Sequence, residues 1–180
     1  EFETKKLSNI SITTFTKYAD DLAVNVAFER ETVTNYLGEV VNKANLTQLH
    51  AAETEKYAHV TYFFNGMHED KLSHEERILV PSPPTPSFDQ VPEMAAIELT
   101  EKVMEKINQK SHDFYVMNYA NPDMVGHTGN LEATVKAVST IDDCLSKIVE
   151  AMKAQGGITV ITADHGNAEE VTKLLSGGID

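Results

Sequence analysis

Apolar residues recur at a helical spacing over several stretches of the chain, most regularly between residues 131 and 152. Gly156 and Gly157 follow that stretch and are expected to end its helix. Residues 53–64 include β-branched and aromatic side chains that suit a strand, but their apolar positions also fit one helical face. We favour a helix there, with Gly66 as its end. The predicted helices span residues 32–45, 53–64, 92–110, 131–152 and 168–175.

Short runs rich in β-branched and aromatic residues predict strands between these helices. The first two runs resemble a hairpin, or the last strands of a preceding unit. The last run is so uniformly apolar that we expect a strand buried on both faces. The predicted strands span residues 10–18, 22–28, 46–51, 78–81, 114–119 and 158–162.

A βαβ unit is predicted by the order of strand 114–119, helix 131–152 and strand 158–162. The fold class is therefore α/β, with a mainly parallel central sheet flanked by helices. Two short motifs follow the two strands of this unit. They are Asp123-x-x-x-His127 and Asp164-His165. Because parallel strands end at one edge of a sheet, where ligands of open α/β sheets bind, we expect these four residues to converge.

Two carboxylates and two imidazoles form a ligand set that suits manganese, zinc or magnesium. Two such ions about 3.5–4 Å apart can polarise a phosphoryl group and lower the pKa of a bound oxygen nucleophile. Four ligands are too few for two ions, so further ligands must come from elsewhere. Taken separately, each motif also suits a simple turn: residues 121–129 read as a connection, and Asn167 as the cap of a following helix.

Lys56 lies among acidic residues near the start of the helix predicted over 53–64. A cation is unfavourable at a helix N-terminus, so the ammonium group of Lys56 could instead contact a phosphate or a carboxylate. The alternative is an ordinary surface lysine in a salt bridge. We assign the remaining histidines to surface or packing roles. They are His50, His59, His68, His74 and His112.

The formal net charge of −13 argues against a nucleic-acid partner, because phosphate backbones favour Lys and Arg. The same charge repels anionic metabolites, so a phosphorylated substrate would need cations bound locally. Cys144 is the single cysteine, which excludes a disulfide within the chain and suits a reducing, intracellular setting. We expect its thiol to be buried and inert. No apolar run reaches the roughly 18 residues of a membrane span, and no signal peptide is visible.

Five segments of the chain carry a common resemblance: residues 52–61, 78–83, 92–94, 118–129 and 162–169. Together they resemble cofactor-independent (2,3-bisphosphoglycerate-independent) phosphoglycerate mutase, a family of the alkaline-phosphatase-like superfamily. The resemblance covers essentially the whole chain, and the two metal motifs are its most specific part. It implies that residues 1–30 are the end of a transferase domain and linker, and that residues 31–180 are the later half of a metal-binding phosphatase domain.

The resemblance also implies an activity and residue roles. Such a mutase interconverts 3-phosphoglycerate and 2-phosphoglycerate in glycolysis and gluconeogenesis, through a phosphoserine at a site with two Mn²⁺ ions, or Mg²⁺ in some members, and without 2,3-bisphosphoglycerate. Asp123 and His127 would bind one ion and Asp164 and His165 the other, while Lys56 would reach the substrate phosphate. The parent protein is expected to be cytoplasmic and monomeric.

By the same resemblance, the nucleophilic serine and the other metal ligands lie in sequence that this chain lacks. We therefore expect a fragment truncated at both ends, without mutase activity by itself. One alternative is another superfamily member, such as a phosphopentomutase or a phosphate-ester hydrolase. The segment Glu53-Thr-Glu-Lys-Tyr57 argues against it, because this segment belongs to the mutase resemblance rather than to the shared metal core. A second alternative is a non-catalytic binding or antigenic fragment.

Overall fold

The computed structural model describes residues 9–19, 21–29, 31 and 33–171, and the chain divides into two compact units, Glu1–Val33 and Thr34–Asp180. In the first unit β1 (Thr13–Thr14) and β2 (Asn25–Val26) pair in parallel. The expected hairpin is therefore wrong, since a hairpin pairs its strands antiparallel. These strands are short, and most apolar side chains around them are exposed, so little packing favours a longer sheet.

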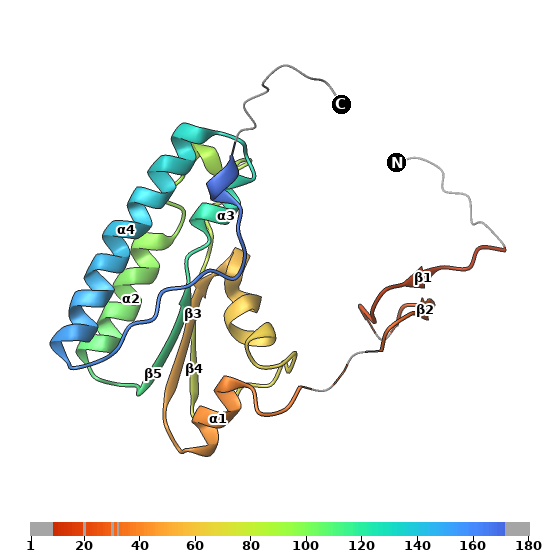
Figure 1. Ribbon diagram of the computed structural model, residues 1–180, viewed down its shortest axis with the longest axis horizontal. Helices are drawn as coiled ribbons and strands as arrows, with labels where there is room; N and C mark the ends of the chain where they lie inside the picture. The colour runs from red at the N-terminus through yellow and green to blue at the C-terminus, as the bar shows by residue number, and fades with distance from the viewer. Residues whose placement is uncertain (1–8, 20, 30, 32, 172–180) are drawn as a thin grey trace. The chain divides into compact units, whose positions relative to one another are not determined.

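A three-stranded parallel sheet organises the second unit (Figure 1). Its central strand is β3 (Gln48–Glu53), with β4 (Glu75–Val80) on one side and β5 (Phe114–Asn118) on the other. All six residues of β3 are buried, as expected for a central parallel strand covered on both faces. The three strands predicted in this region are confirmed, with boundaries shifted by a few residues.

Helices cover both faces of this sheet, which confirms the α/β fold class (Figure 1). Helices α2 and α4 pack together on one face, and α1 and the helical segment around η2 lie on the other. The helices predicted over 32–45, 92–110 and 131–152 are confirmed, although the first two are shorter than expected, and residues 54–63 are helical, as favoured for 53–64. The helix predicted over 168–175 stays a prediction, because the described residues show only a short helical turn at Ala168–Glu170 and the residues after Val171 lie outside them. The helical elements are α1 (Leu37–Lys43), η1 (Thr54–Lys56), η2 (His59–Phe63), η3 (Phe88–Gln90), α2 (Ala96–Asn108), α3 (Asn121–Gly126), α4 (Leu131–Ala154) and η4 (Ala168–Glu170).

The hydrophobic core lies between β3 and the helix pair α2 and α4. Because side chains alternate along a strand, Leu49 and Ala51 of β3 face this core, where they meet Leu99 of α2 and Ile148 of α4. His50 points to the opposite face, where its ring meets that of Phe64 edge-on at 5.2 Å. Each face of β3 thus fixes one helical layer against the sheet.

Helix α4 begins and ends at residues that suit its termini. The Asn130 side chain accepts a hydrogen bond from the backbone N–H of Ala133 and caps the first turn. At the other end Gly156 has a φ of 77°, a conformation that favours glycine, and the helix stops there as predicted. Cys144, on the face of α4 that meets α2, is buried as predicted, and the inertness of its thiol stays a prediction.

The run 158–162 does not form the predicted buried strand. Ile158 is 87% exposed and Val160 is 83% exposed. A strand needs a neighbour to satisfy its backbone groups, and within the described residues the sheet ends at β5 without a further partner. The second strand of the predicted βαβ unit is therefore missing, and the Asp164-His165 motif does not follow a strand of the sheet.

A second buried feature is a polar network around Glu75 at the start of β4. One oxygen of Glu75, Oε2, accepts hydrogen bonds from the Asn65 side chain at 2.9 Å and from the Leu72 backbone N–H at 3.1 Å. The other, Oε1, pairs with Arg77 and lies 3.6 Å from His50 Nδ1. The Glu75 and His50 side chains are fully buried. Burial raises the pKa of Glu75, but its hydrogen bonds outweigh this effect and the net pKa is lowered.

In the described part of the chain, no helix is long and apolar enough to span a membrane.

Candidate functional site

The candidate site lies at the carboxyl edge of the sheet, where β3 and β5 end. η1, which follows β3 directly, carries Lys56, and α3, which follows β5, carries Asp123. The stretch 121–129 was expected to be a connection, so the presence of α3 within it is a correction. Pro122 in the first turn of α3 suits a helix start and was the signal for it.

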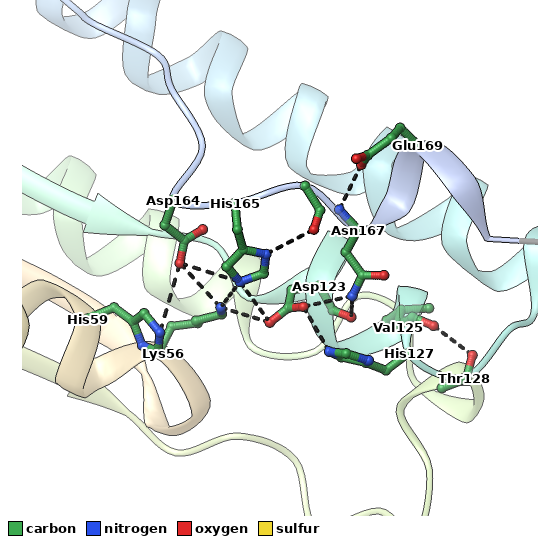
Figure 2. Close-up of polar contacts among 11 residues, drawn as sticks. Lys56, His59, Asp123, Val125, His127, Thr128, Asp164, His165, Asn167 and Glu169 are labelled. Atoms are coloured by element: carbon green, nitrogen blue, oxygen red, sulfur yellow. Dashed lines mark hydrogen bonds and ion pairs between the residues drawn. The ribbon is translucent and has the colours of Figure 1, made fainter. Parts of the chain in front are cut away.

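Lys56 is the centre of the site, and its side chain is only 4% exposed. Its Nζ lies 2.8 Å from Asp123 Oδ2, 3.3 Å from Asp164 Oδ2 and 3.1 Å from His165 Nε2 (Figure 2). The alternative of an ordinary surface lysine is therefore wrong. One ammonium group thus joins two motifs that both lie far along the chain from it, and Asp164 is 108 residues away in sequence.

His165 is held in one tautomer by its own loop. Its Nδ1 lies 3.1 Å from the backbone oxygen of Gly166, and a carbonyl oxygen can only accept, so Nδ1 carries the proton. Nε2 then presents its lone pair to the Lys56 ammonium. Metal-binding histidines in proteins typically have this arrangement, with one nitrogen donating to a carbonyl and the other free to bind a cation.

His127 reaches the site through Asp123 rather than through Lys56. Its Nε2 lies 3.1 Å from Asp123 Oδ1, and its side chain is 70% exposed at the end of α3. Asp123 thus uses one carboxylate oxygen for His127 and the other for Lys56. The four predicted metal ligands are brought together, three around the ammonium and the fourth one carboxylate away (Figure 2).

Asn167 fastens the second motif to α3, a role that the sequence analysis missed. Its Nδ2 donates to the Asp123 backbone oxygen at 3.0 Å and to Asp123 Oδ1 at 2.8 Å. The expected helix cap is wrong, because the Asn167 side chain makes no cap hydrogen bond and instead donates to Asp123. Gly126 permits the approach: a Cβ atom there would lie 3.2 Å from Asn167 Oδ1.

His59 is a further neighbour of the site, and its assignment to a surface or packing role was incomplete. Its Nε2 lies 3.9 Å from Asp164 Oδ2, and its ring contacts that of Phe63 at 5.4 Å. Burial, followed by the positive charge of Lys56, lowers the pKa of His59. Its spacing three residues after Lys56 could have revealed it, since such residues share one helical face.

The charges of the site favour ionised carboxylates. Partial burial raises the pKa of Asp123, but hydrogen bonds from Lys56 and Asn167 have the opposite effect and the net pKa is lowered. Burial also raises the pKa of Asp164, but the charge of Lys56 and the hydrogen bonds of the carboxylate together outweigh it, and the net pKa is lowered. Both groups are therefore anionic at neutral pH and attract a cation.

The donor types of this site suit a divalent cation, since carboxylates are ligands of magnesium and manganese and an imidazole nitrogen is a ligand of transition metals. They converge on a cation, although here it is an ammonium group. Among the described residues, no group of three or more His, Cys, Asp or Glu side chains is already arranged to hold a metal ion. The types of donor atom thus fit a metal ion, whereas their positions are those of side chains hydrogen-bonded to the Lys56 ammonium.

A sequence profile of the Metalloenzyme superfamily matches residues 4–174 of the chain. The 2,3-bisphosphoglycerate-independent phosphoglycerate mutase of Thiobacillus denitrificans is 54% identical over 178 residues, which are 98% of this chain and 35% of that protein. The corresponding mutase 1 of Methanosarcina acetivorans is 48% identical over 176 residues, covering 98% of this chain and 34% of that protein. The chain therefore spans about a third of the length of these relatives.

The fold has a counterpart among solved structures. A crystal structure of Leishmania mexicana phosphoglycerate mutase at low cobalt concentration superimposes with a TM-score of 0.79 and 33% sequence identity, over 87% of this chain and 29% of that one. These matches confirm the resemblance found in the sequence. Together with the profile match over almost the entire chain, they show that this chain belongs to the Metalloenzyme superfamily.

Proposed function

We propose that this chain forms part of a cofactor-independent phosphoglycerate mutase, which interconverts 3-phosphoglycerate and 2-phosphoglycerate through a phosphoserine intermediate. The observation that carries the proposal is the convergence of both acidic motifs on the buried ammonium of Lys56. The mutases to which the chain is similar support the choice of reaction, and as 2,3-bisphosphoglycerate-independent enzymes they agree with a mechanism that needs no 2,3-bisphosphoglycerate.

Asp123 and His127 are proposed to hold one divalent cation, and Asp164 and His165 the other. Mn²⁺ is the proposed ion, with Mg²⁺ as the alternative. When bound, such ions polarise a phosphoryl group and lower the pKa of an oxygen nucleophile. The convergence of these side chains and the lone pair of His165 Nε2, which already faces the positive charge of Lys56, support this assignment.

The residues of this chain bind and orient groups at the site. Lys56 supplies a positive charge close to where a phosphate would lie. This local charge is needed because the chain as a whole has a net charge of −13, which repels anionic substrates. Asn167 donates a hydrogen bond to Oδ1 of Asp123 and so fixes this carboxylate, which leaves Oδ2 of Asp123 directed at the Lys56 ammonium. His165 is oriented by its bond to Gly166, so its lone pair needs no reorientation before a ligand binds.

We also propose the wider setting of the protein. Residues 1–30 would be the end of a transferase domain and linker, and residues 31–180 the later half of the phosphatase domain. The division of the chain into two units at Val33 supports a boundary in this region. The parent would be a cytoplasmic, monomeric enzyme of glycolysis and gluconeogenesis, in line with the single buried cysteine and the phosphoglycerate mutase relatives.

The metal site is tested by titrating the chain with MnCl₂ in a calorimeter. We expect weak but measurable binding, and a loss of about tenfold or more in affinity after Asp164→Ala, because one of the two carboxylates that face the cation is removed. Asp143→Ala on the exposed side of α4 makes the same charge change away from the site and serves as the control. Identical titrations of the native chain and Asp164→Ala would refute the proposed metal site and favour a non-catalytic role.

The reaction itself is tested with 3-phosphoglycerate. We expect the pure 180-residue chain to form no 2-phosphoglycerate in the presence of Mn²⁺, because four ligands are too few for two ions and a nucleophile is not among the residues assigned here. A longer protein that contains this chain is expected to be active with phosphoglycerates and inactive with pentose phosphates. Turnover by the pure chain, or a preference for pentose phosphates, would contradict the proposal.

A further inference from the structure

We propose that the ammonium group of Lys56 competes with the first divalent cation for the same donor atoms, so that metal binding must displace Lys56. The inference rests on the proposed function, since it presupposes that the two proposed ions take donor atoms of Asp123, Asp164 and His165, the same atoms that Lys56 contacts. It assigns to Lys56 a second role besides contact with a substrate phosphate. In this role Lys56 sets the affinity of the site for metal.

The geometry of the ammonium group is the first argument. Its three contacts, at 2.8, 3.1 and 3.3 Å, are two carboxylate oxygens and the lone pair of an imidazole nitrogen. A divalent ion binds such atoms at about 2.0–2.2 Å and needs their lone pairs for itself. The second oxygen of Asp123 is already bonded to His127 and Asn167, so it offers no easy alternative. The ion and the ammonium group therefore exclude each other.

The burial of Lys56 is the second argument. Its side chain is 4% exposed, although a lysine normally keeps its charged end in water. A buried charge persists only where it is paired, and here both Asp123 and Asp164 pair with it. The opposing charges make Lys56 a built-in counter-ion for the two carboxylates when no divalent cation is bound.

The attachment of the second motif explains why such a counter-ion is useful. The run 158–162, which leads to Asp164, is exposed and forms no strand, so sheet pairing does not hold the motif in place. The contacts of Lys56 and Asn167 join this motif to η1 and α3 instead. Lys56 thus gathers the metal ligands before the metal arrives, at the cost of competing with it. The displaced ammonium would then be free to meet the phosphate of the substrate.

The test is a titration of the 180-residue chain with MnCl₂ by calorimetry, together with the rise in Tm at saturating Mn²⁺. Lys56→Met and Lys56→Gln are compared with the native chain. Lys102→Met is the matched control, because it removes the same charge from an exposed lysine that pairs with Glu98 on α2. We expect both Lys56 variants to bind the first Mn²⁺ about tenfold more tightly and to gain more in Tm, and Lys102→Met to remain within twofold of native.

Unchanged or weaker Mn²⁺ binding by a Lys56 variant with native far-ultraviolet circular dichroism would overturn the inference. If Lys56→Met unfolds, Lys56→Gln is judged by the same criterion, and unfolding of both would show a structural role and overturn it as well. The two proposals fail differently. Native binding that is lost in Asp164→Ala but not strengthened in the Lys56 variants leaves the metal site intact, whereas no binding by any variant refutes the metal site itself.

Discussion

Replacing Asp123 by alanine is expected to weaken Mn²⁺ binding by about a hundredfold or more and to detach residues 163–167 from α3. Asp123 is a central residue of the site, since its carboxylate meets Lys56, His127 and Asn167. Its removal deletes a proposed ligand, releases His127 and leaves the buried ammonium of Lys56 with one carboxylate. A factor of a hundred corresponds to about 2.7 kcal/mol, in the range of a lost charged contact at a partly buried site.

The measurement is calorimetry with MnCl₂, combined with hydrogen exchange of the backbone amides of residues 163–171. We expect these amides to exchange faster in Asp123→Ala, while those of β3 remain as protected as in the native chain. Asp143→Ala on α4 is again the charge-matched control. Mn²⁺ affinity within threefold of native, with unchanged exchange at residues 163–171, would show that Asp123 does not organise this site.

Replacing Glu75 by alanine is expected to lower the free energy of unfolding by about 3 kcal/mol, because breaking a buried ion pair leaves its partner groups without compensation. The groups affected are the Asn65 amide, the Leu72 backbone N–H and the charge of Arg77. For a chain of this length the loss corresponds to a decrease in Tm of roughly 6–12 °C. Glu75 lies at the start of β4, so the defect falls on the main sheet.

Urea denaturation of native chain and variant measures this effect. Glu75→Gln retains an oxygen that can accept from Asn65 and Leu72, and we expect it to lose about half as much stability as Glu75→Ala. Glu39→Gln is the surface control, because Glu39 pairs with Lys43 one turn away on α1 and such exposed pairs contribute roughly 0.2–1 kcal/mol. A loss below 1 kcal/mol in Glu75→Ala would contradict the role of this network.

The same network predicts the sign of a pH dependence. The pKa of Glu75 in the folded chain is lowered from its ordinary value of 4.5, because its hydrogen bonds and the nearby His50 together outweigh the effect of burial. Such a group stabilises the fold above its unfolded pKa and loses this contribution as the pH falls through the folded value. The stability difference between native chain and Glu75→Gln should therefore be constant near pH 7 and shrink below about pH 4.5.

Local patterns in the sequence were sufficient for most helices and for the strands of the sheet. The apolar spacing of residues 131–152 and the glycines after it predicted α4 and its end, because helix periodicity and the left-handed conformation of Gly156 are local properties. Pro122 was a local signal for α3 that went unused, so that error was avoidable. The run 158–162 is different. Its composition suits a buried strand, but a strand requires a neighbouring strand to pair with, and the composition of one run does not show whether that neighbour is present.

The candidate site shows the same division. Residue types and spacing were enough to select Asp123, His127, Asp164, His165 and Lys56. The first four are carboxylates and imidazoles in short motifs after predicted strands, and Lys56 lies among acidic residues near a predicted helix start. Expecting them at one edge was right, although the expected reason, a closed βαβ unit, was wrong. Polar contacts of Lys56 and Asn167 place the second motif instead. Such contacts link positions far apart in the chain, so spacing along the sequence cannot reveal them.

Local sequence patterns were enough to predict the α/β class, the strands of the sheet, the superfamily resemblance and the identity of the polar residues at the site. Tertiary structure alone decided that Lys56 is buried between two carboxylates, that His59 lies beside Asp164 and that Asn167 serves Asp123 rather than a helix cap. The reason is physical: helix and strand propensities act over a few residues, whereas burial and charge pairing depend on which distant segments meet.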